Sequence, residues 1–252
     1  MKWFFGAVLA AMFVLGFGSG ARSADDKDAA AILDKAVKAL GGQEKLSKVK
    51  AATWKSKGKI TFNGNDNEFT ATATVQGLDH YRSVFEGEFN GNQVKGVTVL
   101  AKDKGWRQFG DNKMELDENA LANEKRSVYL QVAPMTLTPL KDKGFKVESA
   151  GEKKVGDKPA VGLKVTGPDG KDFTLFFDKD SGLPVQLVAK VVGFGGNEFT
   201  QETTFADYKE FGGIKKATKV VSLRDGEKFI ESHITEFKVL DKVDPQTFEE
   251  PK

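Results

Sequence analysis

The sequence has no cysteine and only two histidines among its 252 residues. Without cysteine there is no disulfide, no thiolate metal ligand, no thiol nucleophile and no lipid anchor on an N-terminal cysteine. The two histidines, His80 and His233, stand far apart, and neither has other metal ligands at a recognisable spacing. We therefore expect a fold stabilised by packing alone, with two surface histidines and no metal or other cofactor.

An excess of charge of one sign is also missing. The chain has 38 Lys and Arg against 36 Asp and Glu, and its first 24 residues contribute Lys2 and Arg22 but no acid. The rest of the chain is therefore formally neutral. Nucleic-acid binding needs clustered, unbalanced Lys and Arg, so the composition argues against a nucleic-acid partner.

Long hydrophobic runs are absent except at the start of the chain. The stretch "MKWFFGAVLAAMFVLGFGSGARSA" combines Lys2, an apolar run from Trp3 to Phe17 and a zone of small residues. This is the layout of a secretory signal peptide. The apolar run is also shorter than the about 20 residues that a membrane-spanning helix needs. We predict a signal peptide at 1–24, export of the protein, and a single domain at 25–252.

The hydrophobic periodicity predicts one helix and then many strands. Between residues 25 and 40 apolar residues recur every three or four positions, and Gly41-Gly42 ends this stripe. In "TWKSKGKITF" the period becomes two, with Trp54, Ile60 and Phe62 on one face and lysines on the other. Further strands are expected at 69–75, 81–86, 94–101, 105–110, 145–149, 159–166, 172–178, 184–192, 198–206, 217–224 and 228–239.

A second helix, at 116–132, interrupts the strands and is expected to end at Pro134. Short loops of turn residues join most strands, which predicts antiparallel hairpins. The simplest fold class is therefore α+β, with a large antiparallel sheet and a few helices on one face.

The stretch "FDKDSGLPVQLV" has the acidic spacing of a calcium loop. Asp178, Asp180 and Gly182 stand at alternate positions, but Ala189 takes the place of the closing carboxylate, and both flanks are strand-like. Asp, Ser and Gly are also the residues of tight turns. We predict a turn between two strands and no cation site.

No set of catalytic residues can be named. There is no G-x-S-x-G motif, and "GFGG" at 193–196 lacks the spacing and the following helix of a phosphate-binding loop. A carboxylate pair such as Glu231 with Glu202 stays open, because a chain with 29% charged residues offers such pairs on any exposed strand face. We predict that the protein is not an enzyme.

Large apolar side chains are abundant at strand positions that share one face. The chain has 20 phenylalanines, four of them in the first 24 residues. They either fill a core, or line the concave face of a curved sheet that holds a lipid-like ligand. The candidate residues for such an apolar cavity are Trp54, Ile60, Phe62, Phe69, Phe85, Trp106, Met135, Leu137 and Phe177.

Three stretches of the chain together form a recognisable pattern. They are the helix "AILDKAVKALGG", the segment 139–192 with "DKDSGLP" between strands, and a closing segment that ends with Asp244, Phe248 and Pro251. In these stretches the chain resembles the LolA/LolB-like superfamily of outer-membrane lipoprotein carriers. The resemblance covers most of the chain after residue 24. It consists of turns and strands at matching places, not of residues with chemical roles. It implies a strongly curved antiparallel sheet, an incomplete barrel of about 10 to 12 strands. An N-terminal helix and a mid-chain helix would cover its concave face.

Two functions follow from the resemblance and the aromatic residues. The first is a periplasmic carrier-like protein that binds a lipid, or the acyl chain of a lipoprotein, in an apolar cavity. The second is an envelope protein-interaction or sensor module on the same fold, without lipid cargo. The sequence does not separate a hollow interior from a filled one.

Overall fold

The structure is a computed structural model of the chain, and it describes residues 24–252 except 63, 90 and 194. All but the last residue of the predicted signal peptide lies outside the described residues. Thirteen strands form one antiparallel sheet. They are β1 (Ala51–Phe62), β2 (Asn65–Gln76), β3 (His80–Phe89), β4 (Asn92–Ala101), β5 (Lys104–Phe109), β6 (Asn112–Glu115), β7 (Lys146–Val155), β8 (Lys158–Thr166), β9 (Asp172–Asp178), β10 (Pro184–Val192), β11 (Glu198–Phe211), β12 (Ile214–Arg224) and β13 (Glu227–Leu240).

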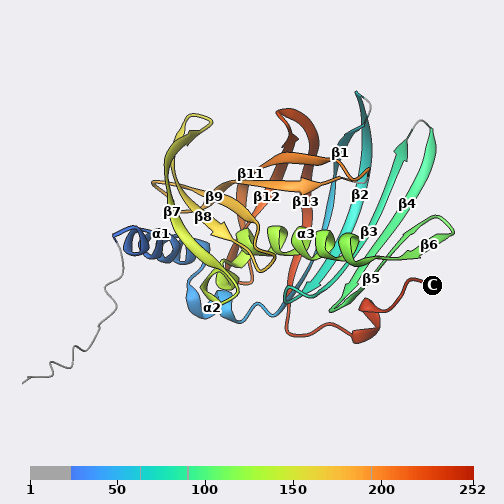
Figure 1. Cartoon of the computed structure of the whole chain (residues 1–252), viewed down its shortest axis with the longest axis horizontal. Helices are drawn as coiled ribbons and strands as arrows, with labels where there is room; N and C mark the ends of the chain where they lie inside the picture. Colours follow the sequence, from blue (N-terminus) through green and yellow to red (C-terminus); the bar gives the residue numbers. More distant parts are fainter. Residues whose placement is uncertain (1–23, 63, 90, 194) are drawn as a thin grey trace, which may run out of the picture.

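The chain builds this sheet as two meanders joined by a helix. Strands β1 to β6 follow one another outward to one edge of the sheet. Helix α3 (Glu118–Thr136) then crosses the inner face to the opposite edge, where β7 begins the second meander (Figure 1). The second meander returns to β13, which pairs with β1 from Ala51↔Leu240 to Ile60↔Ile230. The middle of the sheet is therefore a seam between two distant parts of the chain.

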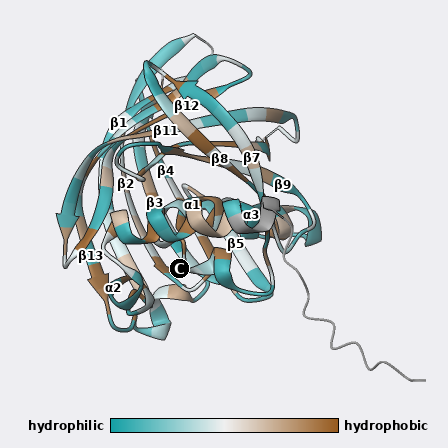
Figure 2. Cartoon of the chain, turned by 90° about the vertical axis from the view of Figure 1, so that its left-hand side faces the viewer, coloured by the Kyte–Doolittle hydropathy of each residue, from teal (hydrophilic) through white to brown (hydrophobic). Residues whose placement is uncertain are grey.

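The sheet is curved and open. It arches over α1 (Ala24–Leu40) and α3, which lie on its concave side (Figure 2). Its edge strands, β6 and β7, lie at opposite ends of the strand order, so the sheet does not close into a barrel. The predicted fold class, a strongly curved antiparallel sheet with an N-terminal and a mid-chain helix, is confirmed. The predicted strand number was slightly low, because β6 lacks an apolar alternation and was missed.

The core lies between the two helices and the inner face of β8, β9 and β10. Leu33, Val37 and Leu40 of α1 are at most 6% exposed, as the predicted apolar stripe requires. From the sheet, Leu163 and Leu175 stand opposite each other and are fully buried. The short helix α2 (Gln43–Ser47) follows α1 and adds the buried Leu46.

The mid-chain helix extends past Pro134, so the prediction that this proline ends it was wrong. Asp117 caps the first turn by accepting a hydrogen bond from the Ala120 amide at 2.8 Å. At the other end the helix continues to Thr136, and Leu137 ends it in the left-handed region with φ 58°. A proline removes one backbone hydrogen bond from a helix. The burial of Met135 and Leu137 in the core offsets that loss and keeps the last turn helical.

The predicted turn in "FDKDSGLPVQLV" is confirmed. β9 ends at Asp178 and β10 begins at Pro184. The Asp178 carboxylate accepts hydrogen bonds from the amide and the hydroxyl of Ser181, both at 2.7 Å, and these lower the pKa of Asp178. Gly182 has φ 73°, as such a turn needs. Asp178, the first acidic residue of this stretch, therefore bonds groups within its own turn.

The end of the chain covers part of the outer face. The 3-10 helices are η1 (Thr138–Lys141), which follows α3, and η2 (Pro245–Phe248) near the C-terminus. Phe248 is buried against Val97 and Val99 of β4, and Trp106 packs against the same cluster. Within residues 24–252, apart from the three positions named above, no helix has the length and apolar character to cross a membrane.

Candidate functional site

The inner face of the sheet is covered unevenly. On the side of β8 to β10 the apolar residues of this face are buried. Phe173 and Phe177, for example, are at most 2% exposed. Toward the hairpin tips of β1 to β6, apolar residues on the same face stay exposed, with Phe62 at 56%, Phe109 at 38% and Met114 at 54%. The hairpins extend well beyond α3 in Figure 1. Large apolar residues in solvent at one end of a sheet are a feature that packing does not explain.

We call this uncovered region the open inner face. Residues directly opposite each other in an antiparallel pair share a face, and the pairings therefore define its members. They are Ser56, Ile60 and Phe62 of β1, Phe69 and Ala71 of β2, Phe85 and Phe89 of β3, Val94 of β4, Phe109 of β5, Met114 of β6, Phe199 of β11, Val220 and Arg224 of β12, and Ile230 and Ile234 of β13.

Four phenylalanines of β1 to β3 form an aromatic cluster on this face. The rings of Phe69 and Phe85 stack at a centroid distance of 5.3 Å. Phe89 continues the row, 6.1 Å from Phe85 and 6.5 Å from Phe62. Phe69 is buried by its neighbours, whereas Phe85 and Phe89 are half-buried and Phe62 is exposed. The cluster therefore becomes progressively more exposed toward the tip of the β1–β2 hairpin.

Strands β1 and β13 approach each other closely at Gly58, beside this cluster. Gly58 pairs with Phe69 in β2, and the pairing of β1 with β13 shifts register between Lys55 and Ser56. A Cβ at Gly58 would lie 2.1 Å from the Glu231 carbonyl oxygen. No side chain larger than hydrogen fits there, and the resulting close approach of β1 to β13 accompanies the bulge.

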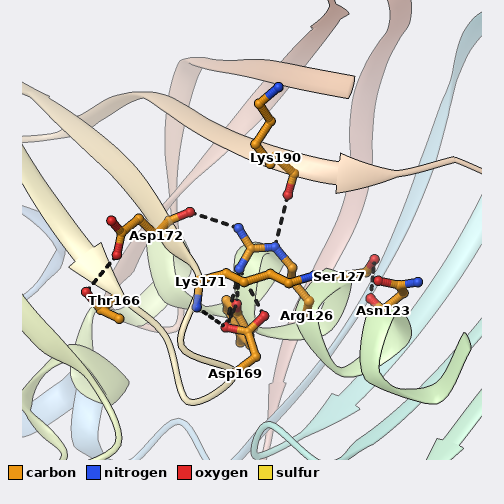
Figure 3. A network of polar contacts seen from close by, with 9 residues as sticks. Asn123, Arg126, Ser127, Thr166, Asp169, Lys171, Asp172 and Lys190 are labelled. Carbon is orange, nitrogen blue, oxygen red and sulfur yellow. Dashed lines mark hydrogen bonds and ion pairs between the residues drawn. The ribbon is translucent and has the colours of Figure 1, made fainter. Parts of the chain in front are cut away.

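Helix α3 is fixed to both halves of the sheet by charged residues. On one side Arg107 of β5 bonds Glu124 at 2.8 Å. On the other, Arg126 is only 4% exposed and lies in the middle of a network (Figure 3). It donates to the backbone oxygens of Lys190 at 3.0 Å and Asp172 at 2.9 Å.

The network is completed by two further groups. The Arg126 guanidinium pairs with the Asp169 carboxylate at 3.1 Å and also bonds the Tyr129 hydroxyl. Tyr129 in turn donates to Asp169 at 2.8 Å. Each of the three guanidinium nitrogens of Arg126 thus donates to an acceptor, as a stable buried charge requires. The arrangement holds α3 across the inner face and is a structural clamp.

The predicted cavity residues separate into three groups. Trp54, Ile60, Phe62, Phe69 and Phe85 lie together on the inner face of β1 to β3. Met135, Leu137 and Phe177 are buried, at 3%, 0% and 1% exposure, and form part of the packed core.

Trp106 forms the third group by itself. It stands opposite Val99 and packs with Val97 and Phe248, on the outer face beneath the C-terminal segment. Its placement among the inner-face residues was therefore wrong. Both faces of β4 and β5 are partly covered, so the alternation of apolar residues does not reveal which face is inner.

Two cations on the inner face were not anticipated. Lys216 of β12 has its ammonium 6.0 Å from the centroid of the Trp54 ring, and burial lowers its pKa to about 8. Arg224, at the end of β12, stands opposite Gln201. The alternation of Ile214, Lys216, Thr218, Val220, Ser222 and Arg224 along β12 is the sequence signal that would have placed both cations on the apolar side.

The outer face carries a different kind of surface. A hollow of about 850 Å³ lies over β1 to β4 and β13. Charged residues predominate in its lining, among them Lys57, Lys59, Glu68, Glu86, Glu88 and Glu231. Lys228 and Lys219 donate to Glu231 and lower its pKa. Glu231 is therefore compensated by two lysines, whereas the lining as a whole has more carboxylates than ammonium groups.

The histidines show no site of their own. His80 bonds Asp79 at 2.8 Å and contacts the Phe248 ring, and His233 is exposed, 4.0 Å from Glu231. Across the described residues, no three or more His, Asp or Glu come together in a way that could hold a metal ion.

Comparison with known proteins supports the fold. No family model matches the sequence, and no curated protein matches it. Among solved structures, a LolA superfamily protein from Nitrosomonas europaea has a TM-score of 0.58 at 10% identity, over 88% of this chain and 97% of that one. A DUF1329 family protein from Desulfovibrio piger has a TM-score of 0.54 at 13% identity, over 88% and 97%.

A third structure extends the same likeness. An outer membrane lipoprotein-sorting protein domain from Vibrio parahaemolyticus has a TM-score of 0.53 at 10% identity, over 86% of this chain and 97% of that one. The chain therefore has a LolA-like fold, and the resemblance seen in the sequence is confirmed at the level of the fold.

Proposed function

We propose that this protein binds the hydrocarbon chain of a lipid or of a lipidated protein on its open inner face, and acts as a carrier. The observation that supports this most directly is the exposure of Phe62, Phe109 and Met114 on the concave side of the sheet. Their burial by a ligand would be favourable at roughly 25 cal/mol per Å² of apolar surface. The LolA-like fold, shared with a lipoprotein-sorting domain, agrees with such a role.

The carrier would work in an exported compartment. The charged start, the short apolar run and the small residues of 1–24 are the basis of this part of the proposal. Expression of the full chain, followed by fractionation and mass measurement of the mature N-terminus, tests it. Removal of about the first 24 residues is expected. A full-length protein in the cytoplasmic fraction would contradict export.

Acyl binding is tested by native mass spectrometry after gentle purification, together with titration of a fluorescent fatty-acid analogue. We expect bound lipid and saturable binding. Replacing Phe62 and Phe109 with glutamine should weaken the binding, because it removes exposed apolar surface. The matched control is Thr70→Gln, on the outward-facing side of β2, which should change nothing. A protein that binds no lipid and no probe would rule the proposal out.

A second candidate, an envelope protein-interaction module, is favoured by the outer-face hollow. Its volume of about 850 Å³ and its lining of charged residues suit a polar partner and not an acyl chain. Co-purification of one protein from envelope extracts, lost on reversing Lys59 and Glu86 to the opposite charges, would support this function. Retention of that partner by the reversed variant would count against the hollow as its site.

A further inference from the structure

Arg224 is a cation fixed in position at the edge of the open inner face. Its Nε donates to the Oε1 of Gln201 at 3.2 Å. Its guanidinium carbon lies 3.5 Å from the centroid of the Phe229 ring and 5.2 Å from that of Phe199. These two aromatic contacts and the hydrogen bond fix the orientation of the Arg224 guanidinium. They leave the N–H donors at its other edge for a ligand. Such paired donors suit a carboxylate or a phosphate.

Arg224 forms no ion pair within the described residues, although Glu227 stands opposite it in β13. Within the described part of the chain no carboxylate lies within ion-pair distance of it, although burial already lowers its pKa. Asp225, the next residue, accepts a hydrogen bond from the Thr200 amide at 2.8 Å, and Glu198 stands 3.5 Å from Lys190. These two acids therefore have other partners, and Glu227, which stands opposite Arg224 in β13, forms no ion pair with it.

The other two inward-facing arginines differ in this respect. Arg107 bonds Glu124 and Arg126 pairs with Asp169. A partly buried cation without a counter-charge is unfavourable unless a ligand supplies one. Arg224 therefore differs from Arg107 and Arg126 in having no acidic partner, as we expect of an arginine that binds an anionic ligand.

The aromatic cluster lies within the length of one acyl chain of Arg224. Ile60 pairs with Ile230 of β13, and Ile230 pairs with Ser222 of β12. Phe62 and Arg224 each stand two residues beyond this row, in strands separated only by β13. Neighbouring strands are about 4.8 Å apart, so the two backbones are roughly 10 Å apart.

We propose that the ligand is an amphiphile with a phosphate or carboxylate group, which Arg224 binds by paired hydrogen bonds while the aromatic cluster binds the hydrocarbon. This inference rests on the proposed acyl-binding function and specifies its ligand class. The oxyanion could belong to a lipid headgroup or to a free phosphate ester. We assign it to the lipid because the cluster lies so close.

The test compares three probes on the purified protein by calorimetry. They are myristoyl lysophosphatidic acid, monomyristoylglycerol, which has the same chain without the phosphate, and glycerol phosphate, which has no chain. Charge-assisted hydrogen bonds to an arginine correspond to roughly tenfold to hundredfold in affinity. We therefore expect lysophosphatidic acid to bind more tightly than monomyristoylglycerol by roughly this factor. Glycerol phosphate should bind much more weakly.

The preference should depend on Arg224. Arg224→Gln should bind both myristoyl probes with equal affinity. The matched control is Arg82→Gln, since Arg82 stands on the outer face near Thr247, and it should keep the preference. If Arg224→Gln does not fold, Arg224→Lys decides the question. It keeps the charge but loses the paired donors, so it must bind lysophosphatidic acid more weakly than the natural protein.

The outcomes distinguish this inference from the proposed function. Equal affinity of the natural protein for both myristoyl probes, or an Arg224→Gln variant that keeps the preference, overturns the inference and leaves acyl binding intact. Equally tight binding of glycerol phosphate overturns the assignment to a lipid. Failure to bind either myristoyl probe overturns the proposed function, and the inference with it.

Discussion

Replacing Lys216 with methionine should make the protein more stable. Lys216 lies on the inner face of β12 with its ammonium near the Trp54 ring, and the described residues offer it no ion pair. Methionine is an unbranched side chain that can occupy the space of the lysine stem. The substitution therefore removes a poorly solvated charge while it retains most of the packing.

The size of the effect follows from the pKa. Burial lowers the pKa of Lys216 from 10.5 to about 8. One pKa unit corresponds to about 1.4 kcal/mol, so the charged form of Lys216 costs the folded state ~3 kcal/mol. This is an upper bound for the gain at neutral pH, because the methionine must also repack.

The pH dependence has a definite sign. Below pH 8 Lys216 is charged in both the folded and the unfolded state, and the whole cost is present. Between about 8 and 10.5 the unfolded state binds more protons than the folded state, so the free energy of unfolding of the natural protein rises with pH. The advantage of Lys216→Met should therefore shrink as pH increases through this range.

Urea unfolding followed by tryptophan fluorescence measures this effect, at neutral pH and again at alkaline pH. The control is Lys215→Met, on the exposed neighbour, which should change stability by no more than about 0.5 kcal/mol. If Lys216→Met proves neutral or destabilising at neutral pH with an unchanged m-value, the argument from burial is wrong. A gain that does not depend on pH would also refute it.

Three further substitutions test the architecture. Arg126→Met should lower the free energy of unfolding by about 1 to 3 kcal/mol, measured by urea unfolding, because the backbone oxygens of Lys190 and Asp172 lose their buried donor. Gly58→Ala should cost at least about 1 to 3 kcal/mol, since its Cβ would meet a backbone oxygen at 2.1 Å, whereas Gly144→Ala, with open space around it, should be near neutral in the same assay. Phe248→Ala should lower stability by about 3 kcal/mol in thermal unfolding, because Phe248 is buried on the outer face. A loss below 1 kcal/mol for Arg126→Met, equal effects of the two glycine substitutions, or an unchanged melting temperature for Phe248→Ala would contradict the corresponding argument.

Local chemistry made most of the secondary structure predictable. The turn at Asp178 to Gly182 depends on residues within a few positions of one another, and the alternation around Trp54 marks a half-buried strand. The end of α3 was missed because packing of the last turn prevails over the local effect of Pro134. A short stretch of sequence does not allow such effects of tertiary packing to be predicted.

The proposed binding surface was predictable only in part. Ile60, Phe62, Phe69 and Phe85 were correctly grouped because two-residue alternation fixes their face. The uncovered position of that face depends on where α3 crosses the sheet, which Arg126 determines through contacts with β9 and β10. No local pattern encodes those contacts, although an arginine within an otherwise apolar helix stripe is a signal worth following.

The seam between β1 and β13 has a consequence for how the chain folds. Each meander consists of hairpins between sequence neighbours, which form quickly from local contacts. The seam joins Ala51 to Leu240, so it can close only when nearly the whole described chain is available for pairing. Until then β1 presents an unpaired edge to other incompletely folded chains. Synthesis that stops before β13 should therefore yield a species that aggregates through β1, and the last strand controls solubility.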